Sequence, residues 1–339
     1  MKRSNVIALF IMFAAVSVFI VVMAFLGGNP KKSIAAPTAT GRVVVLPTPV
    51  STDEQGPVVT AAPTELPTGA VTEQPTEEPT ATAIVRPVIN PSDFSDFSTK
   101  VVSWGITGNW ADPNDRESVK FDIDSAALSA AEDSDYIYLG TNGPEKTIYL
   151  TFNIAYEDSS NSTTKILDIL NASGVKATFF LSKNYFESYG DIVRAIIESG
   201  HTVGSRGDIN AKSGSKRGMV NLGTGEFADT MWEIEKLYQA IAGENTRMQF
   251  YRPEEFSARD MALAGALGYT VIFRSFDYRD WDDYYSRDKA LQKLKDNTTS
   301  GAIFALSSSK YNVEILDDYI VWAKDQGYRF AAIDEAVSG

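Results

Sequence analysis

The carboxyl-terminal two thirds of the chain shows two different patterns of hydrophobic and polar positions. Short apolar, β-branched and aromatic runs such as 147–152 (TIYLTF) are typical of buried strands. Apolar residues spaced three and four apart, as in 226–242, predict helices that pack one face against a core. The chain therefore predicts strands at 147–152, 177–181, 201–204, 248–251, 269–273, 302–306 and 329–333, and helices at 162–173, 191–199, 226–242, 258–267, 286–296 and 312–326.

Alternating strands and helices of these lengths imply an α/β fold built on a parallel sheet, either open or closed into a barrel. The helix at 162–173 is expected to begin with Asn161 or Ser162 as its cap. In both architectures function lies at the carboxyl ends of the strands. The segments of interest are therefore 153–157, 205–210, 252–256, 277–283 and 307–309.

The amino-terminal 92 residues have a different composition. Residues 6–26 are uncharged and mostly apolar, and they follow Lys2 and Arg3. Because a membrane-spanning helix needs about 20 such residues, residues 1–28 are expected to form a retained, single-pass signal anchor with a cytoplasmic amino terminus. Residues 29–92, rich in Pro and Thr, are expected to form a disordered, extended stalk. Residues 93–145 then form an amino-terminal extension of the globular domain at 146–339.

Composition excludes several classes of chemistry. The formal net charge is −13, and no basic cluster is available to neutralise nucleic-acid phosphates. An acidic protein is repelled by anionic polymers, which favours a neutral glycan or a protein as partner. The chain has no cysteine and a single histidine, His201. Thiolate catalysis, cysteine-ligated metals and sites with several imidazole ligands are therefore impossible.

Three framework segments resemble the polysaccharide deacetylase family, also called the NodB-homology family. They are Lys146–Phe152, Gly174–Phe180 and Glu198–Gly204. Further similarity, towards the branch that de-N-acetylates peptidoglycan to make muramic δ-lactam, lies in Ser103-Trp104-Gly105, Tyr149 and Tyr156-Glu157. The resemblance implies a deformed (β/α) barrel in a bacterial protein that acts outside the cytoplasm.

The family's catalytic motifs are degenerate in this chain. Asn153 and Ile154 stand where the resemblance places the catalytic base and the next motif residue, and Ser307 stands where it places the last histidine. Arg206 and Asn210 replace its two zinc-binding histidines. An amide cannot act as a base, and a guanidinium repels a cation. We therefore predict no zinc, no other cofactor and no confident catalytic residue.

The positions that the motifs retain favour a binding groove. Arg252 corresponds to the arginine of one motif, and Asp277, Tyr278, Asp280 and Trp281 belong to another. Aromatic rings stack on sugar faces, while ionic groups orient hydroxyls, so these five residues are substrate-groove candidates. Arg206 is expected to place its charge where the metal charge would lie and to pair with Asp208 or Asp280. His201 matches a framework position and is expected to be structural.

The leading hypothesis is a membrane-anchored, catalytically inactive homologue on the outer side of the bacterial cell membrane that binds cell-wall glycan or an envelope protein. Two alternatives stay open. One is an active C–N amide hydrolase with a rearranged site, in which a cluster of carboxylates holds a cation or supplies an acid and a base. The cluster is Glu254, Glu255, Asp277, Asp280, Asp282 and Asp283. The other is a scaffold module that binds proteins.

Overall fold

The computed structural model describes residues 84–102, 106–107, 120–121, 136–137, 146–209 and 218–337. The expected anchor at 1–28 and most of the expected stalk at 29–92 lie outside this part of the chain. Among the described residues, no helix has both the length and the apolar character needed to cross a membrane.

The centre of the fold is a curled sheet of eight strands in which every pair is parallel. Neighbours follow the order β10-β4-β5-β6-β7-β8-β3, and β9 also pairs with β4. The strands are β3 (Tyr136–Ile137), β4 (Thr147–Ile154), β5 (Thr178–Leu181), β6 (Thr202–Ser205), β7 (Phe250–Tyr251), β8 (Thr270–Ile272), β9 (Ile303–Ser307) and β10 (Arg329–Ala331). A separate antiparallel pair joins β1 (Ile106–Thr107) to β2 (Lys120–Phe121).

The chain that follows β8 brings the two sides of the sheet together. Ser275 N–H donates to the Ile303 carbonyl at 3.0 Å, and Ala305 N–H donates to the Phe276 carbonyl at 3.0 Å. Phe276, which follows β8, thus forms a parallel bridge with Phe304 of β9. The α/β fold with a curled parallel sheet, as expected of a deformed barrel, is confirmed.

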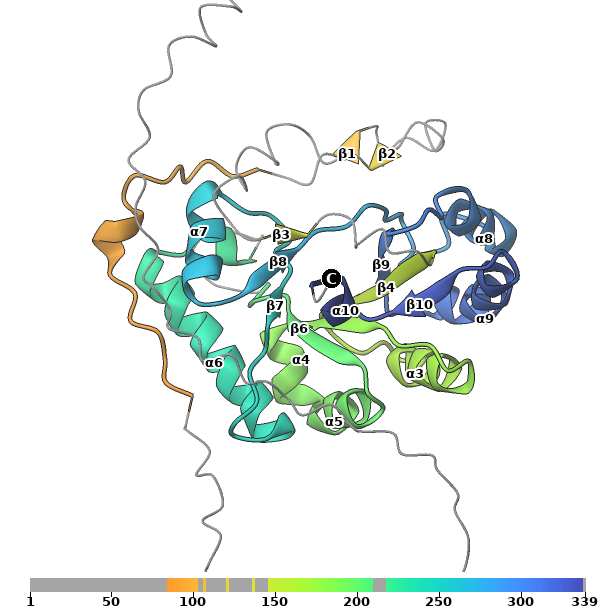
Figure 1. Ribbon diagram of the computed structural model, residues 1–339, viewed down its shortest axis with the longest axis horizontal. Helices are drawn as coiled ribbons and strands as arrows, with labels where there is room; N and C mark the ends of the chain where they lie inside the picture. Colours follow the sequence, from red (N-terminus) through yellow and green to blue (C-terminus); the bar gives the residue numbers. More distant parts are fainter. Residues whose placement is uncertain are drawn as a thin grey trace, which may run out of the picture. The chain divides into compact units, whose positions relative to one another are not determined.

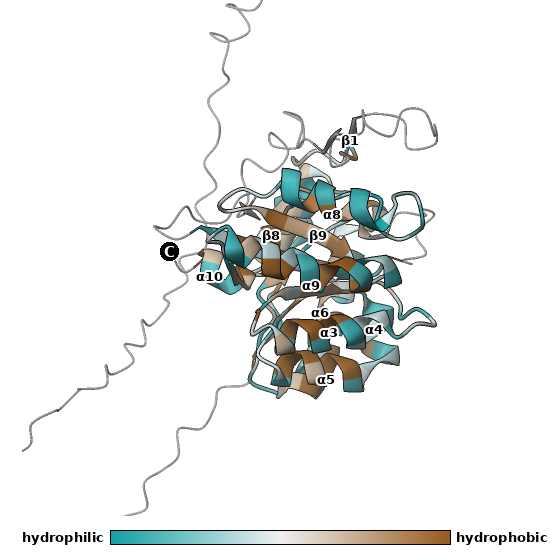
Figure 2. Cartoon of the chain, turned by 90° about the vertical axis from the view of Figure 1, so that its right-hand side faces the viewer, coloured by the Kyte–Doolittle hydropathy of each residue, from teal (hydrophilic) through white to brown (hydrophobic). Residues whose placement is uncertain are grey.

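Helices surround the curled sheet (Figure 1). Their bounds are η1 (Pro91–Phe94), α3 (Ser162–Ala172), α4 (Lys183–Ser188), α5 (Gly190–Glu198), η2 (Gly218–Asn221), α6 (Thr224–Ala242), α7 (Ala258–Ala266), α8 (Arg287–Asp296), α9 (Lys310–Asp325) and α10 (Ile333–Val337). Helices such as α8 and α9 carry both hydrophilic and hydrophobic residues (Figure 2), as amphipathic helices on a sheet do.

The start of α3 differs from the expectation. Asn161 occupies the N-cap position with a left-handed φ of 52°, but its side chain caps nothing. Two carboxylates from the preceding loop do this instead. Asp158 accepts from Ser162 N–H at 3.1 Å, and Glu157 accepts from Thr163 N–H at 2.9 Å. The free N–H groups of a helix start need acceptors, and the charge of a carboxylate suits that end.

Alternation along the strands separates two packed layers. Ile148, Leu150 and Phe152 of β4 belong to the large core beneath the helices, whereas Tyr149 points into the barrel. The inner layer consists of Tyr149, Phe180, Phe250, Ile272, Ile303, Ala331, Ile333 and Ala336. The last two come from α10, whose Ile333 N–H donates to Thr178 Oγ1 at the start of β5. This helix therefore covers the amino ends of the strands.

A glycine makes room for one member of this inner layer. A Cβ at Gly204 of β6 would lie 2.7 Å from the Phe180 ring and 3.1 Å from the Phe250 carbonyl oxygen. The ring of Phe180 therefore occupies the space of the missing side chain. This ring in turn supports the functional layer above it.

Candidate ligand-binding cleft

A cleft of about 320 Å³ opens at the carboxyl ends of the strands. Such an opening is where barrels and open α/β sheets place their ligands. Charged and polar side chains make up most of its lining. The lining residues are Asn153, Arg206, Arg252, Pro253, Glu254, Arg274, Asp277, Tyr278, Asp280, Trp281, Ala305 and Ser307.

The strand period of two explains which residues reach this cleft. On β4, inward-facing Tyr149 is followed two and four residues later by Thr151 and Asn153. The same step leads from Phe250 to Arg252 beyond β7 and from Ile272 to Arg274 beyond β8. Inside the barrel, the apolar layer is thus followed by a polar and charged layer two residues further towards the carboxyl ends of the strands.

Arg252 is the centre of the charged layer. Its side chain is 2 % exposed, and its guanidinium lies 4.1 Å from the centroid of the Phe180 ring. It donates to four neutral acceptors: Thr151 Oγ1 at 2.5 Å, Asn153 Oδ1 at 3.2 Å, and the carbonyls of Ile272 at 3.0 Å and Phe273 at 3.1 Å. The group is thus fixed in position by the sheet itself.

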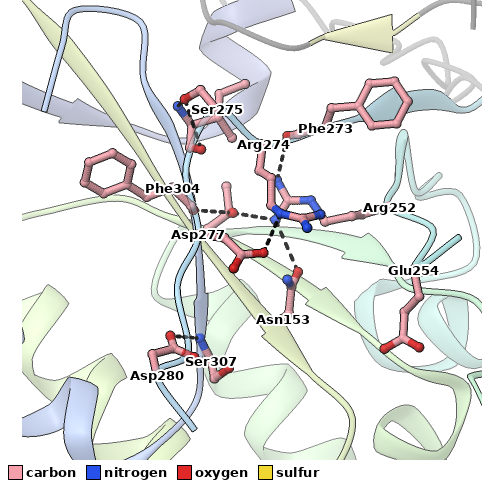
Figure 3. Close-up of polar contacts among 12 residues, drawn as sticks. Asn153, Arg252, Glu254, Phe273, Arg274, Ser275, Asp277, Asp280, Phe304 and Ser307 are labelled. Atoms are coloured by element: carbon pink, nitrogen blue, oxygen red, sulfur yellow. Dashed lines mark hydrogen bonds and ion pairs between the residues drawn. The ribbon is translucent and has the colours of Figure 1, made fainter. Parts of the chain in front are cut away.

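Arg206 and Arg274 each form an ion pair. Arg206 pairs with Glu254, so the expected pairing with Asp208 or Asp280 is wrong. Glu254 follows Arg252-Pro253 at the end of β7, and β7 is the neighbour of β6 in the sheet. Arg274 pairs with Asp277. The guanidiniums of Arg252 and Arg274 lie together above Asn153 and beside Asp277 (Figure 3).

Two carboxyl groups of the cleft titrate in unusual environments. Burial raises the pKa of Asp277, while Arg274, Arg252 and Arg206 act in the opposite direction. Burial also raises the pKa of Asp280, to about 7, against the hydrogen bonds from Ser307 and Asn312. Asp280 Oδ2 accepts from Ser307 N–H at 2.6 Å and from Asn312 Nδ2 at 2.6 Å. Its Oδ1 is buried and has no hydrogen-bond partner.

The two aromatic candidates have different positions. Trp281 is 56 % exposed and stands at the rim of the cleft. Tyr278 also lines the cleft, but it is only 3 % exposed and its hydroxyl donates to Asn312 Oδ1 at 3.0 Å. Its ring packs against Phe276 and Tyr285. Trp281 is therefore the aromatic group that offers a face to a ligand.

The positions that the sequence resemblance aligns with the family's motifs do not fit a zinc ion. Asn153, Arg206 and Ser307 line the cleft, whereas Ile154 is buried in the outer core and Asn210 lies outside the described residues. Within the described part of the chain, no three His, Cys, Asp or Glu side chains gather as metal ligands. The guanidinium of Arg206 lies in the cleft as a fixed positive charge. This set of donors and charges is unsuited to a zinc ion.

The acidic cluster of the rearranged-site alternative is dispersed among other partners. Glu254 and Asp277 pair with arginines of the cleft, and Asp282 pairs with Arg279. Asp280 is tied to Ser307 and Asn312. These carboxylates therefore do not converge on one point where a cation would bind.

His201 lies away from the cleft, at the amino end of β6. It is 5 % exposed, and its Nδ1 accepts from Ala177 N–H at 3.2 Å. Its ring meets Phe179 edge-on at 5.4 Å between centroids. Burial, with a smaller contribution from Lys176, lowers the pKa of His201 to about 4.

Sequence reasoning missed Arg274 as a cleft residue. The expected strand ended at Phe273, so the strand period was not used to predict whether the next side chain points into the barrel or away from it. Continuing the period of two from Ile272 by one more step would have placed Arg274 in the cleft. The part of Asn312 in holding Asp280 was also missed, because it depends on how the start of α9 meets the loop after β8.

The curled sheet, the outer helices and the strand-end cleft define an α/β protein of the deformed-barrel class with a candidate ligand site at the carboxyl ends of its strands. The family model for polysaccharide deacetylase matches residues 140–272. An uncharacterized 30.6 kDa protein of Geobacillus stearothermophilus is 32 % identical over 207 residues, which cover 59 % of this chain and 74 % of that protein. The peptidoglycan-N-acetylmuramic acid deacetylase PdaA of Bacillus subtilis is 30 % identical over 215 residues, covering 61 % and 77 %. The chain belongs to the polysaccharide deacetylase family.

Solved structures agree with this assignment. The structure of B. subtilis PdaA, described as a family 4 carbohydrate esterase, matches with a TM-score of 0.60 at 26 % identity, covering 71 % of this chain and 98 % of PdaA. BA3943 of Bacillus anthracis, described as a pseudoenzyme of the same family, matches with a TM-score of 0.52 at 25 % identity. That match covers 60 % of this chain and 69 % of BA3943.

Proposed function

We propose that this protein is a catalytically inactive member of the family that binds cell-wall glycan in its strand-end cleft. The proposal includes its placement on the outer side of a bacterial membrane, held by the anchor expected at residues 1–28. The observation that carries it is the charge at the motif positions. The neutral amide of Asn153 and the cationic Arg206 line the cleft, and the sequence resemblance aligns them with the family's base and one of its metal ligands.

Catalysis of this kind needs a polarising cation and a group that accepts a proton. Asn153 accepts a hydrogen bond from Arg252, and its amide has no basic lone pair at neutral pH. Asp280, the remaining carboxylate without an arginine partner, has a free Oδ1 and a pKa of about 7, but the described residues gather no set of metal ligands that would supply the polarising cation. The cleft therefore retains the means to hold a ligand and lacks the means to hydrolyse an amide.

A direct test uses the purified full-length chain. Zinc content is measured by mass spectrometry after incubation with the metal, and acetate release is measured on acetylated peptidoglycan. Co-sedimentation with the same peptidoglycan measures binding. Glycan binding without bound zinc or acetate release is the expected result, and PdaA serves as the positive control for deacetylation. Stoichiometric zinc together with acetate release would overturn the proposal.

A pair of tryptophan variants locates the binding surface. Trp281→Ala removes the exposed ring at the cleft rim and is expected to weaken peptidoglycan binding about tenfold, the equivalent of one aromatic contact. Trp232→Ala, on α6 outside the cleft, makes the same chemical change and should leave binding unaltered. Capture of envelope proteins without any peptidoglycan binding would instead favour the scaffold alternative.

The cellular placement has its own test. Fractionation of cells that express the full-length chain should place it in the membrane fraction, and removal of residues 1–28 should release it. External protease should digest it on intact spheroplasts. Protection of the folded domain from external protease would contradict the proposed orientation.

A further inference from the structure

The charges of the cleft do not balance. Three guanidiniums line it, those of Arg206, Arg252 and Arg274. Glu254 and Asp277 pair with the first and the last of these. Asp280 is the third carboxylate, and it has no arginine partner. When Asp280 is protonated, the lining carries one positive charge in excess.

The excess charge is located on Arg252. Its hydrogen-bond partners are two side-chain oxygens and two backbone carbonyls, all of them neutral. Among the described residues Asp277 attracts it electrostatically but forms its ion pair with Arg274. Asn153 is the position at which an acidic side chain would supply the missing negative charge. A buried cation with only neutral partners is costly, so an anion that enters the cleft gains a strong attraction.

The pKa values of the cleft agree with this geometry. Burial lowers the pKa of Arg252 well below its usual range, and the neighbouring charges of Arg274 and Arg206 lower it further. An added anion would relieve that repulsion. Asp280 has a pKa of about 7, so below that pH its free oxygen can carry a proton. It then acts as a hydrogen-bond donor to an anion.

We propose that the cleft is an anion site that binds the carboxylate group of an acidic sugar, with Arg252 as the principal cation and protonated Asp280 as an additional donor. This inference rests on the proposed glycan-binding function and specifies the class of glycan. A guanidinium suits a carboxylate because its N–H groups match the two oxygens. Trp281 at the rim supplies the face on which the sugar ring stacks.

The proposal corrects the expectation of a neutral glycan. That expectation followed from the formal net charge of −13 over the whole chain. Affinity depends on the potential inside the cleft, and charges on the far surface are screened by salt beyond about 8–10 Å. The three buried guanidiniums therefore determine which ligands the cleft accepts.

The experiment compares two matched pairs of sugars on the purified full-length chain by titration calorimetry. The first pair is methyl glucuronide and methyl glucoside, and the second is N-acetylmuramic acid and N-acetylglucosamine. Each pair shares a ring and differs in one carboxyl-bearing group, and the two pairs carry the carboxylate at different positions. At pH 5.5 at least one acidic sugar is expected to bind about tenfold or more tightly than its neutral counterpart.

Two isosteric variants test the residues. Asn153→Asp gives Arg252 an internal carboxylate and is expected to remove the preference for the acidic sugar. Asp280→Asn replaces the titrating carboxyl by a permanently neutral donor. In the wild type the acidic sugar should bind about tenfold more weakly at pH 8 than at pH 5.5, since ionised Asp280 repels it. The variant should lose this pH dependence.

The groups around Asp280 make the pH comparison specific. Its neighbours are Asp277 and Tyr278 from the same loop, Ser307 from β9 and Asn312 from α9, and the three arginines line the same cleft. The pKa of Tyr278 is raised by burial, so it stays neutral throughout the range. Burial also raises the pKa of Asp277, so the loss of the pH dependence in Asp280→Asn is the observation that assigns the titration to Asp280.

The outcomes separate the two proposals. Equal binding of acidic and neutral sugars would overturn the anion site and leave glycan binding intact. An acidic preference that survives in Asn153→Asp would place the carboxylate elsewhere and also overturn it. Failure of all four sugars and of peptidoglycan to bind would overturn the proposed function together with the inference. Acidic preference lost in Asn153→Asp supports both.

Discussion

The two ends of the barrel each bury a titratable group in its neutral form. At the amino end His201 lies in the wall of a cavity of about 230 Å³, next to the aromatic ring of Phe179. At the carboxyl end Asp280 lies in the cleft, among three arginines and two other acidic groups. Each has one buried polar atom without a hydrogen-bond partner, Nε2 of His201 and Oδ1 of Asp280.

The difference between the ends lies in their neighbours. His201 is kept neutral by burial, with a smaller contribution from Lys176, and Arg247 of the same cavity wall donates to the Leu267 carbonyl. Burial raises the pKa of Asp280, with a further contribution from Asp277, and the same cleft is lined by Arg252, whose hydrogen-bond partners are all neutral. The comparison shows that burial suppresses ionisation at both ends, and that the cleft also contains Arg252, a buried cation whose hydrogen-bond partners are all neutral.

The largest expected effect comes from removing that cation. Arg252→Met leaves four hydrogen-bond acceptors without their donor and is expected to lower the free energy of unfolding by about 3–5 kcal/mol. Urea unfolding measures it. Arg287→Met, which breaks a half-exposed pair with Asp318, is the matched control and should cost about 1 kcal/mol or less. A similar cost for both variants would show that Arg252 is not integrated into the sheet.

The Asp280→Asn variant separates the two ends by pH. Because its folded pKa is raised, Asp280 contributes stability that is fully present below about pH 4 and is lost as pH rises through about 7. The variant lacks this loss. From pH 4 to pH 8 it should therefore gain about 2–4 kcal/mol of unfolding free energy relative to wild type, measured by urea unfolding. Exposed Asp288→Asn is the control, and an equal pH trend in it would refute the assignment.

Overpacking beneath the cleft is expected to have a smaller effect. Gly204→Ala pushes a methyl group into the Phe180 ring, at 2.7 Å, and should destabilise the fold by about 1–3 kcal/mol. Since Phe180 supports Arg252, the cleft should also lose sugar affinity. Gly225→Ala meets nothing within 4 Å and lies in a helix, so it should be neutral or slightly stabilising. Comparison of thermal midpoints of the two variants provides the measurement.

His201 should show the opposite pH trend to Asp280. Its folded pKa is lowered to about 4, so its contribution to stability is present above about pH 6.5 and is lost as pH falls towards 4. His201→Asn retains an acceptor and cannot titrate. Wild type should therefore gain about 1–2 kcal/mol over the variant as pH rises from 4 to 6.5. Parallel stability curves for the two proteins would contradict this account.

Most of the framework could be predicted because hydrophobic periodicity depends on local sequence. The helix expected at 258–267 is observed as Ala258–Ala266, and the strand expected at 302–306 as Ile303–Ser307. α4, which has only six residues, was missed because it is too short to establish a helical period. α10 was missed because the expected last strand extended to Ile333, its first residue, and the remaining four residues are too few to establish a helical period.

The cleft was less predictable because its pairings depend on distant elements. The strand period placed Asn153 and Ser307 at the right end of the sheet. The same sequence could not show that Glu254, rather than Asp208, would reach Arg206, because that pairing depends on how β7 lies beside β6. Nor could it show that Asp280 would be bound by Asn312 from α9. Charge balance in the cleft therefore had to come from the structure.

The smallest expected effect is on zinc binding after a partial restoration of the family motif. Arg206→His returns an imidazole to one ligand position and removes a positive charge, so on charge alone it should favour a metal. A stable zinc site, however, needs at least three protein ligands in tetrahedral geometry. Asn153 is an amide held by Arg252, and Asp277 remains paired with Arg274. Zinc content of the variant, measured by mass spectrometry after dialysis, should equal that of wild type. One tightly held zinc per chain would show that the remaining cleft groups can rearrange into a set of zinc ligands. The positive charge of Arg206, rather than the number of ligands, would then be what prevents wild type from binding the metal.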